Sequence, residues 1–350
     1  MVKLKTSVKI VVIVGLLFMI ILPFLLPRTN YFMNIIISLC YFGILATSLN
    51  LLLGYTGQIS LGFSAFMCTG GYAYGIFCKA YQFPGSQLVG IALAIFISFL
   101  VGLTLGIACS RLSAIFLAMA TGGFLKALTA FIMNEQWLTG GANGLIGIPR
   151  FKFFGIDKLK DYTFYLYYIA LAIACLIILF CYRLVNSKTG RALQAIKTSP
   201  IAAAAMGINV TGYKFLICGI TAGFAGLSGT ILAANYTYLS PDMFGKMSVK
   251  ILTMGVAGGM GTIVGPIFGT VTMGILPELL RPFANHLDGI YGLVLIVVFL
   301  FMPTGIYGGL KKLISWVQSK TAKKALPEAV AASAGAELKE TVEASGKEKR

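Results

Sequence analysis

Ionisable and nucleophilic residues are few in this sequence, and they are not arranged as an enzyme would need them. His286 is the only histidine, and the seven cysteines are scattered among apolar stretches without a CxxC pair. A catalytic triad or a metal site requires several such groups to converge. The phosphate-binding pattern GxxxxGK[ST] is absent too, since Gly245 and Lys246 stand without its other residues. The sequence therefore predicts no enzyme activity, no metal and no other cofactor.

The remaining candidates for chemistry are polar side chains inside apolar stretches. Gln58 and Ser60 lie in the glycine-rich segment 54–62, where unwound backbone is tolerated only if it is buried or lines a cavity. Close helix packing is the alternative explanation for the glycines themselves. Lys126 stands near the middle of another apolar stretch, where a charge is costly unless its amine reaches an interface. We take Gln58, Ser60 and Lys126 as candidates for a translocation pathway.

A basic loop at about 186–213 is too polar to cross a membrane and contains the signals of a short helix. Ser199 can cap its start, Pro200 suits the first helical position, and Gly207 can adopt the left-handed conformation that ends a helix. Two turns of alanine-rich helix are marginal in water, so this helix needs a surface to pack on. That surface is either a groove on a soluble protein or the lipid headgroups.

The composition of the whole chain shows which elements must position these residues. Of 350 residues, 58% are hydrophobic and 11% charged, with a mean hydropathy of +0.88, whereas soluble domains carry roughly a quarter charged residues. The sequence predicts an all-α polytopic transmembrane bundle of about ten spans. We place the spans at 8–27, 31–53, 59–79, 88–109, 112–134, 163–184, 213–234, 247–258, 263–281 and 287–304. Around 247–281, where glycines are dense, a broken or re-entrant helix is an equal alternative to two spans.

The net charge of +17 follows from topology rather than from a nucleic-acid surface, because the lysines and arginines lie between the apolar spans. Their distribution favours both termini in the cytoplasm. The first apolar run is predicted to be an uncleaved span. A transmembrane domain at 1–310, with an external loop at 135–162, is then followed at 311–350 by an amphipathic stretch and a disordered cytoplasmic tail.

The carboxylates bear on the energy source and on the solute. Those of the membrane portion lie on or near the predicted outer side, which disfavours proton coupling. Sodium coupling through backbone carbonyls at broken helices stays open as an alternative. A lining with little deep charge suits a neutral, zwitterionic or apolar small solute.

Five segments, in order along the chain, resemble the LivM-type permeases of branched-chain amino acid ABC importers. The basic loop reads TGRALQAIK from Thr189 and IAAAAMGINVT from Ile201. The other four segments are Leu49–Gly62 (LNLLLGYTGQISLG), Leu138–Pro149 (LTGGANGLIGIP), Gly258–Pro266 (GGMGTIVGP) and Pro303–Gly308 (PTGIYG). Together they extend over about 45–308, and ordered matches are far more specific than one glycine motif.

The resemblance implies a fold, a function and partners. The fold would be that of a type II-like importer permease with two pseudo-symmetric halves, in a bacterial inner membrane. The partners would be a second, LivH-like permease, two cytoplasmic ATPases that bind ATP, and a periplasmic or lipid-anchored binding protein. The solute would be leucine, isoleucine or valine, although similar permeases carry urea or short amides.

The resemblance also assigns roles to residues. Arg191, Ala202, Ala203 and Gly207 would form the contact with the ATPase, in a loop that transmits closure of the nucleotide-bound dimer. Ile201 stands where many importer permeases have glutamate, so a salt bridge at that point is not expected. Gly140, Gly141 and Asn143, in the external loop, are candidates for docking of the binding protein.

Overall fold

The protein is described from a computed structural model, which covers 19–21, 23, 29–83, 85–109, 112, 114–151, 162–279 and single positions between 289 and 309. The predicted spans 8–27 and 287–304 lie largely outside these residues, and the tail 311–350 lies wholly outside them. The span count and the two-halved organisation therefore stay predictions.

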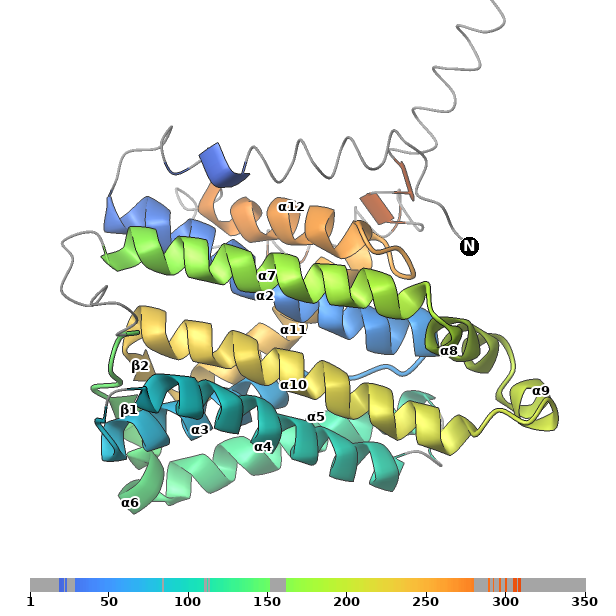
Figure 1. The fold of residues 1–350 in the computed structure, drawn as a ribbon, viewed down its shortest axis with the longest axis horizontal. Helices are drawn as coiled ribbons and strands as arrows, with labels where there is room; N and C mark the ends of the chain where they lie inside the picture. The colour runs from blue at the N-terminus through green and yellow to red at the C-terminus, as the bar shows by residue number, and fades with distance from the viewer. Residues whose placement is uncertain are drawn as a thin grey trace, which may run out of the picture.

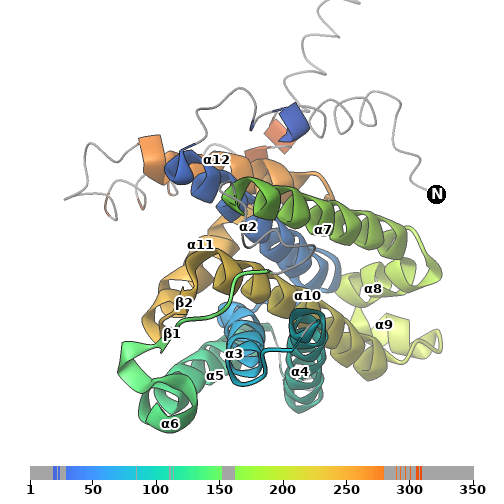
Figure 2. The ribbon, with the colours of Figure 1, turned by 60° about the vertical axis from the view of Figure 1, so that its left-hand side comes forward.

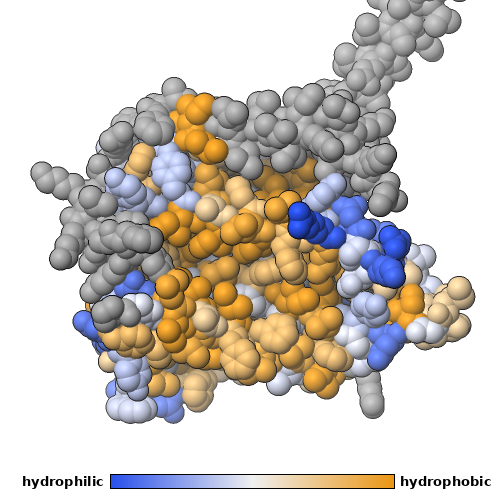
Figure 3. Space-filling view, in the orientation of Figure 1, coloured by the Kyte–Doolittle hydropathy of each residue, from blue (hydrophilic) through white to orange (hydrophobic). Residues whose placement is uncertain are grey.

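Eight helices in the described residues correspond one to one with the eight predicted spans between 31 and 281. They are α2 (Asn30–Thr56), α3 (Ser64–Ala80), α4 (Ser86–Cys109), α5 (Ala114–Asn134), α7 (Tyr162–Val185), α10 (Val210–Tyr236), α11 (Pro241–Gly258) and α12 (Gly265–Leu279). Of these, α2, α4, α5, α7 and α10 are long and apolar enough to cross a membrane. The helices run roughly along the long axis of the molecule (Figure 1). Figure 3 shows apolar side chains over their middle and hydrophilic ones toward both ends, as expected for a helical membrane protein.

The centre of the bundle is α10, which packs against α4, α3 and α2. Glycines make this packing close: a Cβ on Gly70 of α3 would lie 2.3 Å from the Cα of Gly226 in α10. One on Gly229 would lie 2.2 Å from the carbonyl oxygen of Met67. Small residues at helix contacts are what membrane helices use to bring their backbones together.

Around 247–281 the described residues form a hairpin of two helices, α11 and α12. Neither is among the helices long and apolar enough to cross a membrane, so two spans and a re-entrant hairpin both stay predictions. Gly258 lies against Gly265, and Met254 lies against Gly269, so the two helices are antiparallel. The turn 259–264 between them contains Gly259 and Gly261, with φ of 112° and 78°. The first helix begins at Pro241, six residues before the predicted boundary, because proline is well placed in a first helical turn.

The external loop contributes to the only two strands in the described residues. These strands lie at the end of the α11–α12 hairpin that is far from its turn. After α6 (Gln136–Thr139) and the 3-10 turn η1 (Gly141–Asn143), β1 (Leu145–Ile146) pairs antiparallel with β2 (Tyr238–Leu239). Both strands lie at one end of the helices, and α8 (Lys188–Thr198) and α9 (Pro200–Ala205) lie at the other (Figures 1 and 2).

Candidate coupling surface and translocation site

The basic loop folds as two short helices with the predicted capping. The Ser187 hydroxyl accepts a hydrogen bond from the Gly190 N–H at 3.5 Å, at the start of α8, and the Ser199 hydroxyl accepts one from the Ala202 N–H at 3.3 Å, at the start of α9. Pro200 is the first residue of α9, and Gly207 has a φ of 81° just after its end. The N–H of Ile208 also reaches the carbonyl of Ala203, which completes a Schellman motif. The prediction of a capped two-turn helix is confirmed.

The two helices are buried to different extents. Leu193 and Ile196 of α8 are fully buried against the bundle, whereas α9 projects beyond the helix ends (Figure 1). Of the predicted contact residues, Ala203 is buried, while Arg191, Ala202 and Gly207 are exposed. Sequence reasoning expected an alanine face, but Ile201 and Met206 are the larger apolar side chains there, 85% and 83% exposed. Two such side chains on one projecting turn indicate a contact surface.

A polar network joins this loop to the membrane helices. The Lys197 ammonium, from α8, donates to the carbonyl oxygen of Gly54 in the last turn of α2, at 2.7 Å. One turn earlier, the Asn50 side chain accepts from the Gly261 N–H and donates to the Thr262 carbonyl, both at 2.8 Å. Asn50 thus satisfies two backbone groups of the α11–α12 turn, which would otherwise be costly to leave unpaired.

Glycines bring these backbones together. A Cβ on Gly54 would lie 2.2 Å from Asn50 Oδ1 and 2.6 Å from the Gly261 nitrogen. On the other side of the turn, a Cβ on Gly305 would lie 2.3 Å from the Cα of Gly259. Residues that are far apart in sequence therefore meet at this network: Asn50 and Gly54, Lys197, Gly259 to Thr262, and Gly305.

The segment 57–63 between α2 and α3 is unwound, as its glycines suggested. It lies between α5 and α11, where the Leu61 N–H donates to Thr121 Oγ1 at 3.1 Å and the Ser248 hydroxyl donates to the Leu61 carbonyl. Gln58 and Ser60 are 6% and 1% exposed. In the described part of the chain, Gln58 Oε1 and Ser60 Oγ have no hydrogen-bond partner. Such groups cost stability, so they are candidates to meet water or a solute.

The other sequence candidates lie apart from these groups. Lys126 is on the exposed face of α5, and its place in the pathway stays a prediction. At the opposite end of the molecule, Gly140 and Gly141 have φ of 80° and 62° and shape the turn that presents the exposed Asn143. Trp137 in the same loop is 91% exposed, which sequence reasoning did not single out as a docking residue.

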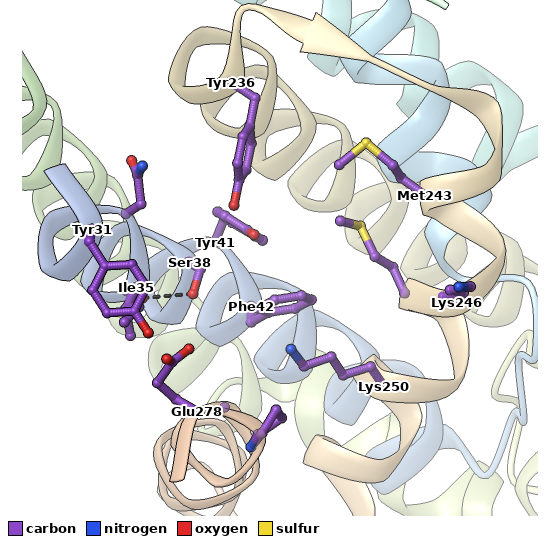
Figure 4. Close-up of a pocket in the computed structure, with 14 residues that line it drawn as sticks. Tyr31, Ile35, Ser38, Tyr41, Phe42, Tyr236, Met243, Lys246, Lys250 and Glu278 are labelled. Carbon is purple, nitrogen blue, oxygen red and sulfur yellow. Dashed lines mark hydrogen bonds between the residues drawn. The ribbon is translucent and has the colours of Figure 1, made fainter. Parts of the chain in front are cut away.

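A cavity of about 540 Å³ lies between α2, α11 and α12, on the side of the external loop (Figure 4). Lys250 and Glu278 line it, together with aromatic and methionine side chains. Lys250 falls within the span predicted at 247–258 but was not singled out as a site residue, and the structure places it in the third turn of α11. The spacing of Met243, Lys246, Met247 and Lys250 was the signal available, because i, i+3, i+4 and i+7 share one helix face.

Within the described residues, no three His, Cys, Asp or Glu side chains are placed to hold a metal ion. The molecule offers instead an exposed tip, a backbone network beneath it, and a polar cavity toward the opposite end.

Comparison with known proteins identifies the family. The sequence model of the family described as branched-chain amino acid transport system / permease component matches residues 31–303. The high-affinity branched-chain amino acid transport permease LivM of Salmonella typhimurium is 28% identical over 81% of this chain and 71% of its own length. LivM of Escherichia coli K12 is 27% identical over 75% of this chain and 67% of its own.

Similarity extends to the LivH permeases: that of Escherichia coli K12 is 32% identical over 35% of this chain and 40% of its own length. No solved structure matches the chain significantly. Since the family model covers most of the chain, this multi-pass membrane protein belongs to the branched-chain amino acid transport permeases, of the LivM type.

Proposed function

We propose that this protein is a permease subunit of an ATP-driven importer for leucine, isoleucine and valine. It alternates between outward-open and inward-open states in a bacterial inner membrane, with both termini and the α8–α9 loop in the cytoplasm. Its partners are a LivH-like permease, two ATPases and an extracytoplasmic binding protein. The names of its relatives support the solute class and the second permease.

The observation that carries the proposal is the path from the exposed tip of α9 to the membrane helices. A partner that moves α9 also moves α8, because the two helices share the Ser199 cap. The α8 helix in turn holds the end of α2 through the 2.7 Å bond from Lys197 to Gly54. Asn50, one turn away, holds the α11–α12 turn. Force applied at the tip is thus delivered to two backbone breaks within the membrane domain.

The contact with the ATPase would use the residues that the resemblance indicated, with two additions. Ala202, Ala203 and Gly207 leave room for close approach, and Arg191 supplies charge at the edge. Ile201 and Met206 would fill apolar depressions in the ATPase, since such anchors dominate the affinity of interfaces. On the external side, Gly140, Gly141 and Asn143 would contact the binding protein.

The function is tested by reconstituting the whole complex in proteoliposomes with labelled leucine. We expect uptake that requires ATP inside the vesicles on the ATPase side and needs no ion gradient. Uptake that requires a sodium or proton gradient and ignores ATP would show a secondary transporter. ATP-dependent uptake of urea or a short amide, in the absence of leucine uptake, would identify the other solute class.

The coupling surface is tested separately with Gly207→Arg. Arginine strains a backbone with a φ of 81° and adds bulk at the tip, so we expect loss of ATPase copurification and of uptake. Gly85→Arg is the matched control, because Gly85 also has a positive φ of 89° and open space around it. Normal ATPase association in the Gly207 variant would contradict the assignment of this loop.

A further inference from the structure

The cavity between α2, α11 and α12 is lined by side chains of two kinds. One kind is apolar and includes Ile35 of α2 with Met243 and Met247 of α11. The other is charged, with Lys250 on α11 and Glu278 near the end of α12. In Figure 4 the ammonium of Lys250 and the carboxylate of Glu278 point toward the space between these helices from facing sides. The volume of about 540 Å³ lies within the usual range for small-molecule sites.

Lys250 is held in a way that leaves its ammonium able to bind a ligand. Its Nζ lies over the Phe42 ring, 4.7 Å from the ring centroid. A cation–π contact stabilises the charge from one side only. A half-buried lysine within a bundle of membrane helices is costly, which makes Lys250 a candidate functional residue. The three N–H donors of the ammonium match a carboxylate.

Glu278 supplies the opposite charge. A carboxylate has about four acceptor positions, so it can accept from a ligand ammonium in addition to its contacts within the chain. The two charges stand on different helices of the hairpin, with the cavity between them. A simple anion would be repelled by Glu278, and a simple cation by Lys250 and Lys246. A molecule that carries both charges can pair with Lys250 and with Glu278.

We infer that this cavity binds the amino-acid zwitterion, with Lys250 receiving the α-carboxylate, Glu278 receiving the α-ammonium, and Met243, Met247 and Ile35 packing on the apolar side chain. The inference rests on the proposed function and adds a recognition site within the permease itself. Methionine is suited to this role because its flexible, polarizable side chain adapts to branched chains of different shape. A urea-like neutral solute would have no use for the pair of charges.

The first test uses the complete complex in proteoliposomes, with Lys250→Met and Glu278→Gln, singly and together. Each single variant should lower ATP-dependent leucine uptake by about tenfold or more, since each removes a charge-assisted contact. The double variant should be hardly worse than either, because both contacts serve one ligand. Lys250→Arg should keep part of the uptake. Lys79→Met, which changes an exposed lysine in the last turn of α3, is the control and should transport normally.

A second measurement covers variants that fail to assemble. Met247→Cys places a thiol on the cavity wall, and its maleimide labelling at that position is followed by mass spectrometry in the otherwise unaltered complex. Leucine should slow this labelling, whereas leucinamide, which lacks the carboxylate, and 4-methylpentanoate, which lacks the ammonium, should not.

The outcomes separate the inference from the proposed function. If the wild-type complex shows no ATP-dependent leucine uptake, the proposed function is wrong. If it transports leucine and both charge variants do so equally well, the cavity is not the recognition site. The inference is also wrong if leucine does not slow the labelling of Met247→Cys. It is equally wrong if leucinamide slows this labelling as much as leucine does.

Discussion

The two ends of the α11–α12 hairpin use polar groups in opposite ways. At its turn, the side chains of Asn50 and Lys197 are bonded to backbone atoms of neighbouring segments at 2.7 to 2.8 Å. At its other end, Lys250 and Glu278 point toward a cavity. Polar side chains therefore hold backbone segments together at the turn, whereas at the cavity they are placed to bind a ligand.

The contrast matters because both regions lie on the same helices. The α2 helix contributes Asn50 and Gly54 to the network and Phe42 to the cavity wall. Under the proposed function, a displacement of its end by α8 would be transmitted along this helix toward the cavity. We expect changes in the network to alter assembly and coupling, and changes in the cavity to alter transport of the solute alone.

The largest effect is expected from Gly54→Ala. The new Cβ would lie 2.2 Å from Asn50 Oδ1 and 2.6 Å from the Gly261 nitrogen, so backbone must move, at a cost of about 1–3 kcal/mol or more. We expect a lower melting temperature in detergent and loss of uptake. Gly43→Ala, in the same helix with nothing within 4 Å, is the control and should be neutral or stabilising. Equal melting temperatures for the two variants would argue against a tight network.

A smaller effect is expected from Lys197→Met, which removes one bond to a carbonyl and leaves the backbone in place. The loss is about 1 kcal/mol or somewhat more, so the complex should assemble while ATP hydrolysis drives less uptake. Lys188→Met, at the other end of α8 and also exposed, is the matched control. The measurement is the ratio of leucine transported to ATP hydrolysed, and an unchanged ratio would show that Lys197 carries no coupling.

Sequence reasoning succeeded where structure depends on local chemistry. The α9 helix was predicted because Ser199, Pro200 and Gly207 act on their immediate neighbours. The helices between 31 and 281 were predicted because apolar length is a strong signal. The unwound segment at 57–63 followed from its glycines. Gln58 and Ser60 are buried there, without hydrogen-bond partners for Gln58 Oε1 and Ser60 Oγ in the part of the chain that the structure describes, and their role in the pathway stays a prediction.

The network and the cavity were missed because they depend on contacts between distant segments. Lys197 and Gly54 are 143 positions apart, and no local pattern connects them. Lys250 was passed over, although it falls within the span predicted at 247–258, because no local pattern shows that it meets Phe42 of α2. Lys126 attracted attention by its place in the middle of a span, but position along a helix does not reveal which face a side chain occupies.

The smallest effect is expected from Ser60→Ala, and it tests whether an unpartnered group at membrane depth serves the solute rather than the fold. Ser60 Oγ has no partner in the described residues, so its removal should leave the melting temperature unchanged or slightly higher, because a buried unsatisfied hydroxyl costs stability. Ser64→Ala is the matched control, since the Ser64 hydroxyl donates to the Phe244 carbonyl at 2.6 Å, and its loss should lower the melting temperature.

In leucine uptake the larger direct effect is expected from Ser60→Ala, whereas in melting temperature it is expected from Ser64→Ala. If Ser60 contacts the passing solute or its water, Ser60→Ala should slow leucine transport by a few-fold at unchanged stability, whereas Ser64→Ala should affect transport only as far as it destabilises the protein. Normal transport by Ser60→Ala would remove this residue from the pathway. Recognition would then depend on the cavity alone, because the segment 57–63 would serve only as a connection between α2 and α3.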